Sequence, residues 1–381
     1  MPVLYLDRRE ALTFVYENQA LFDAAGAANP FACSQWLRLF IRHIATENWR
    51  FIVPVRAEGC MLLYVRPDEP QRYFAPANHY APLYAPVATS MADRTAVLQG
   101  LAQSLTKHRP DCAAVNFAPL DADASDTQAL ENAFDACGWV SKRYVCFGNW
   151  YLPSAGLSFD AYMSERDPHL YALWARKSKC FHSGDEGARI ELYTSPAEAG
   201  EGLRAYGQID ARNRKRSEAC PALILDWIRA CAEQRWLRLG VAYVHDTPVA
   251  AQFWFTLHGR AYLYRSFFDE TYARYAAPAV LTAHMIEHSL ERDRVQEIID
   301  LSGTDAFMRF WLPARRERIG LLMCNRGTMR GLLLATHQSC SDARQQWLRD
   351  FRPAPAMPPA PPPGFHAQHR RTGSDMSYVR L

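Results

Sequence analysis

The hydrophobic and polar positions of the first half alternate between strand-like and helix-like periods. Apolar residues recur with a period of two in short runs and with a period near 3.6 in longer ones, which predicts a mixed α+β order. The predicted strands are 3–6, 49–57, 60–67, 113–120 and 139–152, and the predicted helices are 8–25, 33–46, 92–108 and 126–137. Glu58-Gly59 is a turn signal between two of these strands.

The second half shows a similar order of patterns after a break at 153–168, a stretch rich in Pro, Gly and Ser. Its predicted helices are 169–182, 196–216, 221–235, 278–292 and 304–311, and its predicted strands are 188–194, 237–246, 248–259, 260–269, 295–301 and 318–324. Two halves with one order of elements indicate a tandem repeat of a domain. We therefore predict domains at 1–152 and 169–350, joined by a linker at 153–168.

A further helical pattern covers 326–350, and we expect this helix to pack on the second domain. The sequence after it is proline-rich and then polar and charged, so residues 351–381 lack the apolar surface that would offset the entropy of ordering. We expect this tail to be extended and disordered.

Composition restricts the class of protein. The 381 residues are 49% hydrophobic, enough for two ordinary cores, and the formal net charge is only +3. The whole-protein charge thus does not point to nucleic acid or to an anionic membrane. No uncharged run approaches the ~20 residues of a spanning helix, and the N-terminal stretch is interrupted by charges, so we expect a cytoplasmic protein with no membrane span. The ten cysteines show no C-x-x-C pair, which predicts buried thiols without a disulfide framework.

One stretch combines a buried strand with acidic residues. In "EIIDLSGTDAFMRFW", residues 297–311, Asp300 and Asp305 flank Gly303, and Arg309 and Trp311 follow. A carboxylate at the exit of a buried strand is costly unless it is paired or used. We predict that Asp300 and Asp305 hold or deprotonate an acceptor amine, and that Arg309 binds an acceptor carboxylate or phosphate. The alternative is a structural one, in which Asp305 pairs with Arg309 and Trp311 is core.

The second half resembles a known family. Its order of elements is similar to that of the GNAT acyltransferase fold. Its sequence motifs resemble those of the branch that includes the CelD-type acetyltransferases and the FemAB/FemX aminoacyl transferases. The stretches that carry the resemblance are Arg212 after a long helix, "LRLGVAYVHDTPVAAQFWF", "AYLYRSFFDETYARYAAPAVLTAHMIEH" and "IIDLSGTDAFMRFW". It covers roughly residues 165–325, and the first half resembles a degenerate partner copy. The expected fold is α+β, with two tandem GNAT-like domains, each a mixed, mostly antiparallel sheet flanked by helices.

The resemblance implies a donor site where two strands separate and the next helix begins. That turn is "ARYAAP", residues 273–278, and a helix N-terminus there favours anions. The residues that would bind the donor are Arg265, Arg274, Ala277 and Ala279. The turn lacks the glycine-rich loop of a coenzyme A site, and without glycine the backbone approaches a pyrophosphate less closely. An aminoacyl-tRNA or a carrier protein is therefore a candidate donor in addition to acyl-CoA.

The same resemblance suggests an acceptor site. We expect Tyr264, on a central strand, to be a proton donor, and Arg212, Tyr243, Arg309 and Trp311 to bind the acceptor, a small molecule or a glycan precursor. Aromatic residues on central strands are also typical core residues. The basic runs 211–217 and 176–179 offer phosphate contacts to a tRNA, or simply a solvated polar face.

Two other interpretations remain open. "HMIEH", residues 284–288, fits the H-x-x-E-H pattern of a zinc peptidase, with Glu317 as a third ligand, although we expect no metal. The second interpretation is a catalytically inactive protein with two GNAT-like domains, which docks a partner through its proline-rich tail. Deletion of residues 353–381 distinguishes the two: an enzyme should keep its turnover, whereas a docking protein should lose its partner. Our leading interpretation is a transferase that moves an acyl or aminoacyl group onto an amine or hydroxyl.

Overall fold

The computed structural model describes residues 2–88, 94–183, 187–212, 219–302, 305–335 and 344–345, without the side chains of 180, 182, 183 and 305. The proline-rich tail, most of the basic run 211–217 and most of the helical pattern 326–350 therefore lie outside the described residues. Gly303 and the side chain of Asp305 do too.

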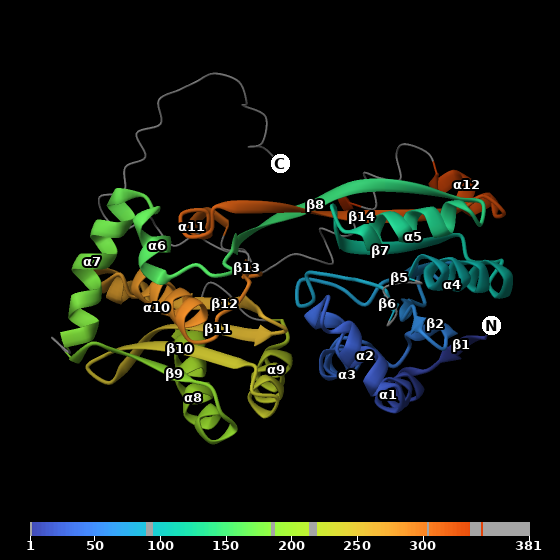
Figure 1. Ribbon diagram of the computed structural model, residues 1–381. Helices are drawn as coiled ribbons and strands as arrows, with labels where there is room; N and C mark the ends of the chain where they lie inside the picture. The colour runs from blue at the N-terminus through green and yellow to red at the C-terminus, as the bar shows by residue number, and fades with distance from the viewer. Residues whose placement is uncertain are drawn as a thin grey trace.

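The first half contains helices packed on short and long strands (Figure 1). Its elements are β1 (Val3–Leu6), α1 (Arg8–Glu17), α2 (Gln19–Ala25), the 3-10 helix η1 (Pro30–Ala32), α3 (Ser34–His43), β2 (Arg50–Arg56), β3 (Gly59–Cys60), β4 (Leu63–Val65), β5 (Arg72–Phe74), β6 (Val87–Ala88), α4 (Arg94–His108), β7 (Ala114–Asp121), α5 (Ser125–Asp135) and β8 (Trp139–Pro153). Helix α1 begins with a capping box, in which Asp7 accepts from the Glu10 N–H and Glu10 accepts from the Asp7 N–H.

The second half adds a second group of helices and strands. Its elements are α6 (Phe159–Ser164), α7 (Pro168–Ser183), β9 (Arg189–Tyr193), α8 (Pro196–Arg212), α9 (Pro221–Glu233), β10 (Leu237–Val244), β11 (Thr247–Leu257), β12 (Arg260–Phe268), the 3-10 helix η3 (Glu270–Tyr275), α10 (Ala277–Glu291), β13 (Glu297–Asp300), α11 (Asp305–Met308), β14 (Ala314–Asn325) and α12 (Met329–Leu334). The stretch predicted as a linker thus contains helix α6, capped by Ser158.

All described strands belong to one connected sheet, in the order β6-β3-β2-β4-β5-β7-β14-β8-β13-β12-β11-β10-β9, with β1 on β2. The pair β8 and β14 runs antiparallel along the top of Figure 1 and links the two halves, because β8 also pairs with β13 through Leu152 and Ile298. Strand β14 is predicted as the last strand of the second half, yet it lies between β7 and β8. Alternation of apolar residues predicts a strand but does not identify the sheet that receives it.

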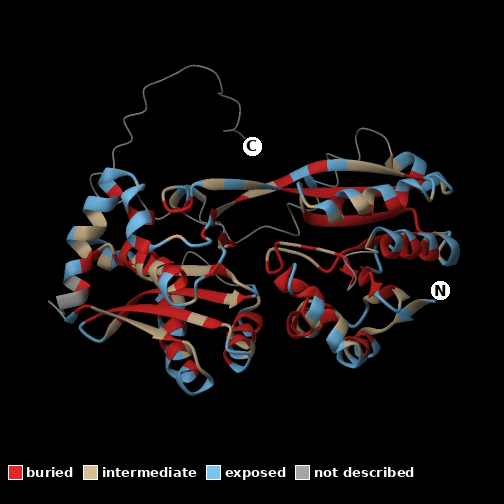
Figure 2. Cartoon of the chain, in the orientation of Figure 1, coloured by how far each residue is buried: buried red, intermediate tan, exposed pale blue. Residues whose placement is uncertain are grey.

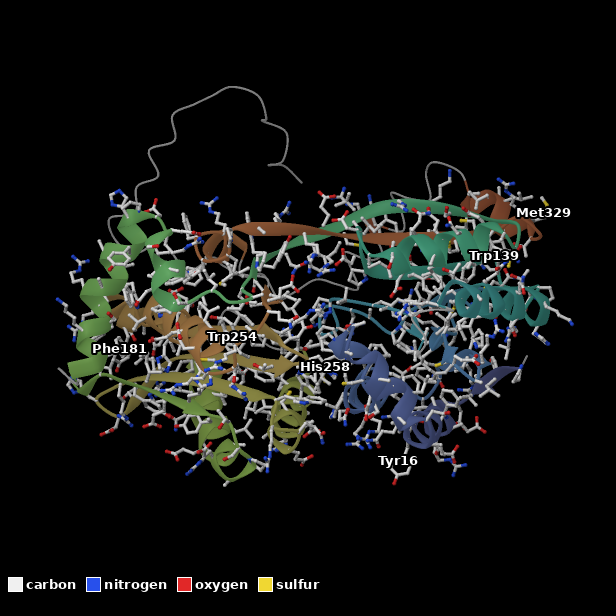
Figure 3. All side chains as sticks on the ribbon, viewed as in Figure 1. Tyr16, Trp139, Phe181, Trp254, His258 and Met329 are labelled. Atoms are coloured by element: carbon white, nitrogen blue, oxygen red, sulfur yellow. The ribbon has the colours of Figure 1, made fainter. Side chains whose placement is uncertain are left out.

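The sheet of the second half has two faces with separate cores. One face, called the α8 face, packs against α8 and α9 and also against Trp36 and Phe31 of the first half. The other, called the α10 face, packs against α6, α7 and α10. Figure 2 shows the resulting pattern, with buried residues along the strands and the inner sides of helices and exposed residues on the outer sides. In Figure 3, Trp254 lies inside the second half, whereas Tyr16 of α1 and Met329 of α12, exposed at 66% and 77%, lie on the outer surface.

An ion pair with a buried arginine lies at the junction of the halves. Arg318 of β14 is only 2% exposed; its guanidinium is 2.9 Å from a carboxylate oxygen of Asp121 and donates to the Asn149 side-chain oxygen at 2.8 Å. Arg316, on the same strand, bonds to Glu297 of β13 at 2.7 Å. Charges taken out of water need such partners, so the packing of β14 depends on groups from both halves.

Candidate functional site

Two neighbouring strands separate in the middle of the second-half sheet. Strand β12 pairs in parallel with β13 from Arg260↔Glu297 to Leu263↔Asp300, and the Leu301 N–H donates to the Leu263 carbonyl at 2.8 Å. Beyond this point the described part of β12 is paired only with β11. Tyr264 is the extra residue of a bulge, since Phe253 pairs with Arg265 and Trp254 with Leu263. This is the separation of strands that the resemblance predicts for a donor site.

Asp300 ends β13 at the point of separation. It is 3% exposed, and its Oδ1 accepts from the backbone N–H of Ser302 at 2.9 Å and from the Ser302 hydroxyl. These bonds form a turn at the end of β13 and stabilise the buried carboxylate. Asp300 therefore has a structural role in this turn, and its catalytic role stays a prediction.

Tyr264 and Arg265 face the first half. The Tyr264 hydroxyl donates to the carbonyl oxygen of Tyr80 at 2.7 Å, and the Arg265 guanidinium lies 4.2 Å from the centre of the Tyr264 ring and 5.5 Å from that of Tyr80. The Tyr80 hydroxyl in turn accepts from the Cys220 N–H, next to the start of α9, at 2.8 Å. Tyr264 is fully buried, so the structure presents it as a contact between the halves.

The structure separates the two residues predicted to share proton transfer. Side chains alternate between faces along a strand, and Ile298 belongs to the α10 core whereas Ile299 belongs to the α8 core. Asp300 lies two residues after Ile298 and thus on the α10 face, whereas Tyr264 packs in the α8 core. An atom that Asp300 deprotonates is therefore on the other side of the sheet from the Tyr264 side chain.

Helix α10 begins directly beside the separated strands, but it offers few backbone donors. Its N-cap, Ala276, is left-handed with φ 52° and ψ 33°, a conformation that favours glycine. Pro278 has no N–H, and the Ala279 N–H donates to the Ala276 carbonyl at 2.9 Å. Of the first three helical residues, only Ala277 keeps an N–H for an anion, and the side chains of Ala277 and Ala279 are buried.

Side-chain cations surround the same turn. Arg274 is exposed and donates to the Tyr275 hydroxyl at 2.8 Å, and Lys177 of α7 donates to the Arg274 carbonyl at 2.6 Å. Arg176, the neighbour of Lys177 in the basic run of α7, is exposed. The positive charge at the start of α10 therefore comes from long side chains rather than from backbone N–H groups of the helix N-terminus.

A buried polar network fixes α10 on the sheet. Gln252 of β11 is 1% exposed; its side-chain nitrogen donates to the Thr282 hydroxyl at 2.7 Å and its oxygen accepts from the Trp254 indole at 3.0 Å. The Thr282 hydroxyl donates to the Pro278 carbonyl at 2.8 Å. Both amide groups are satisfied, so the network holds the first turn of α10 in a defined position.

Tyr243 and Arg212 lie toward the edge of the sheet. The hydroxyl groups of Tyr243 and Tyr193 are 2.7 Å apart, and Tyr193 donates to the carboxylate of Glu191. Burial raises the pKa of both tyrosines, so both remain protonated at neutral pH. Arg212 ends α8 and donates to the Pro248 carbonyl at 3.2 Å. Their acceptor-binding roles stay predictions.

Arg309 and Trp311 have different surroundings. Arg309 is exposed, just after α11, with its guanidinium 4.8 Å from the centre of the Phe310 ring. Trp311 is fully buried, and its carbonyl accepts from the Tyr162 hydroxyl at 2.6 Å. Trp311 thus belongs to the α10 core in this structure, as the structural alternative predicts, while contact with an acceptor stays untested.

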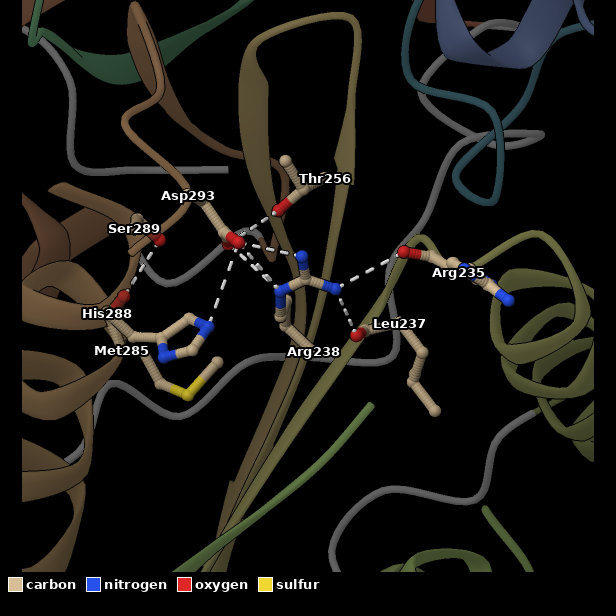
Figure 4. Close-up of polar contacts among 8 residues, drawn as sticks. All are labelled: Arg235, Leu237, Arg238, Thr256, Met285, His288, Ser289 and Asp293. Carbon is tan, nitrogen blue, oxygen red and sulfur yellow. Dashed lines mark hydrogen bonds and ion pairs between the residues drawn. The ribbon is translucent and has the colours of Figure 1, made fainter. Parts of the chain in front are cut away.

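His288 of the H-x-x-E-H stretch belongs to a different arrangement (Figure 4). The His288 Nε2 lies 3.7 Å from the Asp293 carboxylate, which also binds Arg238 through two bonds of 2.7 and 2.9 Å. Burial, and secondarily the charges of Arg238 and Arg292, lower the pKa of His288 against the opposing effect of Asp293. Glu317 is exposed on β14, and among the described residues no group of three or more His, Cys, Asp or Glu is arranged for a metal.

Sequence reasoning missed the contribution of the first half to this site. The proline-punctuated stretch around Tyr80 lies outside every predicted element, yet it contacts Tyr264, Arg265 and the start of α9. Its signal is composition, since aromatic residues between prolines in a loop are unusual unless they are packed.

The comparisons with known proteins concern the family and the fold of the chain. The family described as acetyltransferase (GNAT) domain matches residues 171–307. Residues 171–307 of the second half therefore match a GNAT domain, which supports a transferase. A search of curated proteins found no match.

Solved structures show the same fold across both halves. FemX has a TM-score of 0.57 at 9% identity, covering 88% of this chain and 99% of that chain. A conserved protein of unknown function from Bacteroides thetaiotaomicron has a TM-score of 0.50 at 13% identity, covering 86% and 100%. The predicted fold class, α+β with tandem GNAT-like domains, is confirmed. No described helix is long and apolar enough to cross a membrane.

Proposed function

We propose that this protein transfers an aminoacyl group from an aminoacyl-tRNA to the amine of a small-molecule or glycan-precursor acceptor. The observation that carries the proposal is the start of α10, which lies at the separation of β12 and β13 but keeps a single backbone donor in its first three residues. A pyrophosphate bound at a helix N-terminus needs several free N–H groups and close backbone approach. Acyl-CoA is therefore the less suitable donor for this turn.

The cations around the turn support a polyanionic donor. Arg274 and the α7 residues Arg176 and Lys177 present flexible positive side chains, which suit phosphates spaced along a nucleic-acid backbone. Arg212 ends α8 where the basic run 211–217 begins, and the rest of that run lies outside the described residues. The fold likeness to FemX over most of the chain is consistent with this branch of the resemblance.

In the proposed reaction, the acceptor nitrogen attacks the carbonyl carbon of the aminoacyl ester. A C–N bond forms, the C–O bond to the tRNA ribose breaks, and the departing oxygen takes up, by way of Asp300, the proton that the amine loses. Asp300 removes the proton that the amine loses, because its carboxylate lies at the end of β13 where the strands separate. Backbone N–H groups of β12 beyond Tyr264 would stabilise the oxyanion.

A donor screen by thermal shift tests the proposal, because a ligand that binds only the native state raises the melting temperature. Charged tRNA is expected to stabilise the protein, and coenzyme A and acetyl-CoA are expected to leave it unchanged. Stabilisation by CoA without any effect of charged tRNA would return the protein to the acyl-CoA transferases. No response to any donor would favour the inactive partner-binding protein.

Asp300→Asn tests the base. Asparagine keeps the side-chain oxygen that accepts from Ser302, so the turn is preserved while the charge is lost. We expect transfer to fall by about 10²–10⁴-fold with little change in stability. Ser302→Ala is the matched control, since it removes a bond of the turn and keeps the carboxylate. Full activity in Asp300→Asn would leave Asp300 with a structural role only.

A further inference from the structure

A cavity of about 180 Å³ lies in the first half, away from the separated strands. Trp49, Tyr64 and Phe74 form part of its wall as a continuous stack, with ring centres 4.2 and 5.5 Å apart. Phe40 and Ile44, from the region of α3, also line it. An apolar cavity of about 150 Å³ is known to accommodate benzene, so this volume suits one six-membered ring.

Two amide side chains that line the cavity have unused donors. Asn116 is 8% exposed; its Oδ1 accepts from the Tyr144 hydroxyl at 2.7 Å, and no described group accepts from its Nδ2. Asn78 uses its Oδ1 for the N–H groups of Tyr80 and Ala81, at 2.9 and 3.2 Å, and its Nδ2 likewise has no described acceptor. Asn116 is a buried residue and Asn78 is half-buried, so both amide nitrogens are available to oxygen atoms of a ligand or of water.

The charge around the cavity is balanced. Arg66 lines it, with its guanidinium 4.5 Å from the centre of the Phe74 ring, 2.8 Å from a carboxylate oxygen of Glu69 and 3.8 Å from one of Asp68. Because the acids already compensate the guanidinium, an anionic ligand gains little here. Aromatic walls with amide donors instead suit an uncharged ring that has an apolar side and several oxygens.

One stretch of the first half links the cavity to the separated strands. Asn78 lines it, and Tyr80, two residues further along the chain, contacts both Tyr264 and Arg265 of β12. Two residues span at most about 7 Å. A ring held against Asn78 therefore lies next to the segment of the first half that contacts the separated strands.

We propose that this cavity binds a single uncharged, oxygen-bearing six-membered ring, as in a hexopyranose, and that this ring belongs to the acceptor. Asn78 and Asn116 donate to its oxygens, and the aromatic stack covers its apolar side. The assignment of the ring to the acceptor rests on the proposed function, whereas the binding of the ring does not.

Saturation-transfer NMR with methyl glucoside tests binding on the full chain without any donor. The wild type is expected to give a saturable signal in the millimolar range. Asn116→Leu, which removes the free donor, is expected to weaken binding about tenfold. Tyr144→Phe is the matched control, because it breaks the bond to the Asn116 oxygen without changing an atom that lines the cavity, and it should bind like the wild type.

Ala77→Leu provides a variant that does not depend on hydrogen bonds. Ala77 lines the cavity and is half-buried, so the larger side chain fills the space, and binding should be lost while the melting temperature is kept. Unchanged glucoside binding in both Asn116→Leu and Ala77→Leu would overturn the site, and binding of benzamide but not of glucoside would overturn the ring class. If no donor binds yet both variants lose the glucoside, the ring site stands and only its acceptor role falls.

Discussion

Ala276 at the start of α10 allows a quantitative test of the local backbone argument. A left-handed conformation costs an L-residue roughly 1–2 kcal/mol, and glycine avoids this cost. Glycine also has more freedom in the unfolded chain, which costs about 0.5–1 kcal/mol. With φ 52° at Ala276, the two effects leave Ala276→Gly more stable than the wild type by up to about 1.5 kcal/mol.

Ala279→Gly is the comparison for this prediction. Ala279 lies inside the first turn of the same helix with ordinary helical geometry, so glycine should destabilise the protein there by about 1 kcal/mol. Urea unfolding followed by circular dichroism measures both variants, and the two midpoints should move in opposite directions if the slopes agree. Equal destabilisation of both variants would refute the claim that Ala276 is strained.

Three other predictions concern stability and reactivity. Asp121→Asn, which leaves the buried Arg318 without its carboxylate, should cost roughly 3–5 kcal/mol in urea unfolding, and Arg318→Met should cost clearly less, because Asp121 is partly exposed. The pKa of His288 is lowered from 6.5 in the fold, so the unfolded chain binds the proton more readily and stability should fall as the pH drops below about 6.5; His288→Gln should lack this component in pH-dependent melting curves. Iodoacetamide at pH 8 should modify the half-buried Cys220 before Cys60, whose pKa burial raises to about 12, as peptide mapping would show, and the reverse order would contradict the burial.

The sequence predicted most elements of the second half because each has a regular period and clear ends. Pro221 and Pro278 begin helices α9 and α10 close to their predicted positions, and "VQEIIDL" contains β13. These signals are local, so one sequence is enough to find them. The resemblance to the GNAT fold then predicted that two strands separate next to α10, as β12 and β13 do.

The missed features depend on contacts between distant parts of the chain. Period-two alternation identified β14 as a strand, but it did not identify β7 and β8 as its partners. Their pairing, and the ion pair of Arg318 with Asp121, are contacts of the folded chain. Similarly, the sequence around Tyr80 is that of an ordinary loop, and only the structure shows that the Tyr80 carbonyl accepts from the Tyr264 hydroxyl. Such pairings span more than a hundred residues, and no local pattern records them.

The opposite faces of Asp300 and Tyr264 have a consequence for the mechanism. Because Tyr264 is buried and donates to Tyr80, it couples the two halves, and a substitution that removes its hydroxyl should act through the position of the first half. Asp300 lies on the α10 face, beside the helix that is expected to meet the donor. Proton transfer and the attachment of the first half are thus assigned to opposite sides of one sheet, so variants at the two residues should show different defects, in turnover at Asp300 and in acceptor affinity at Tyr264.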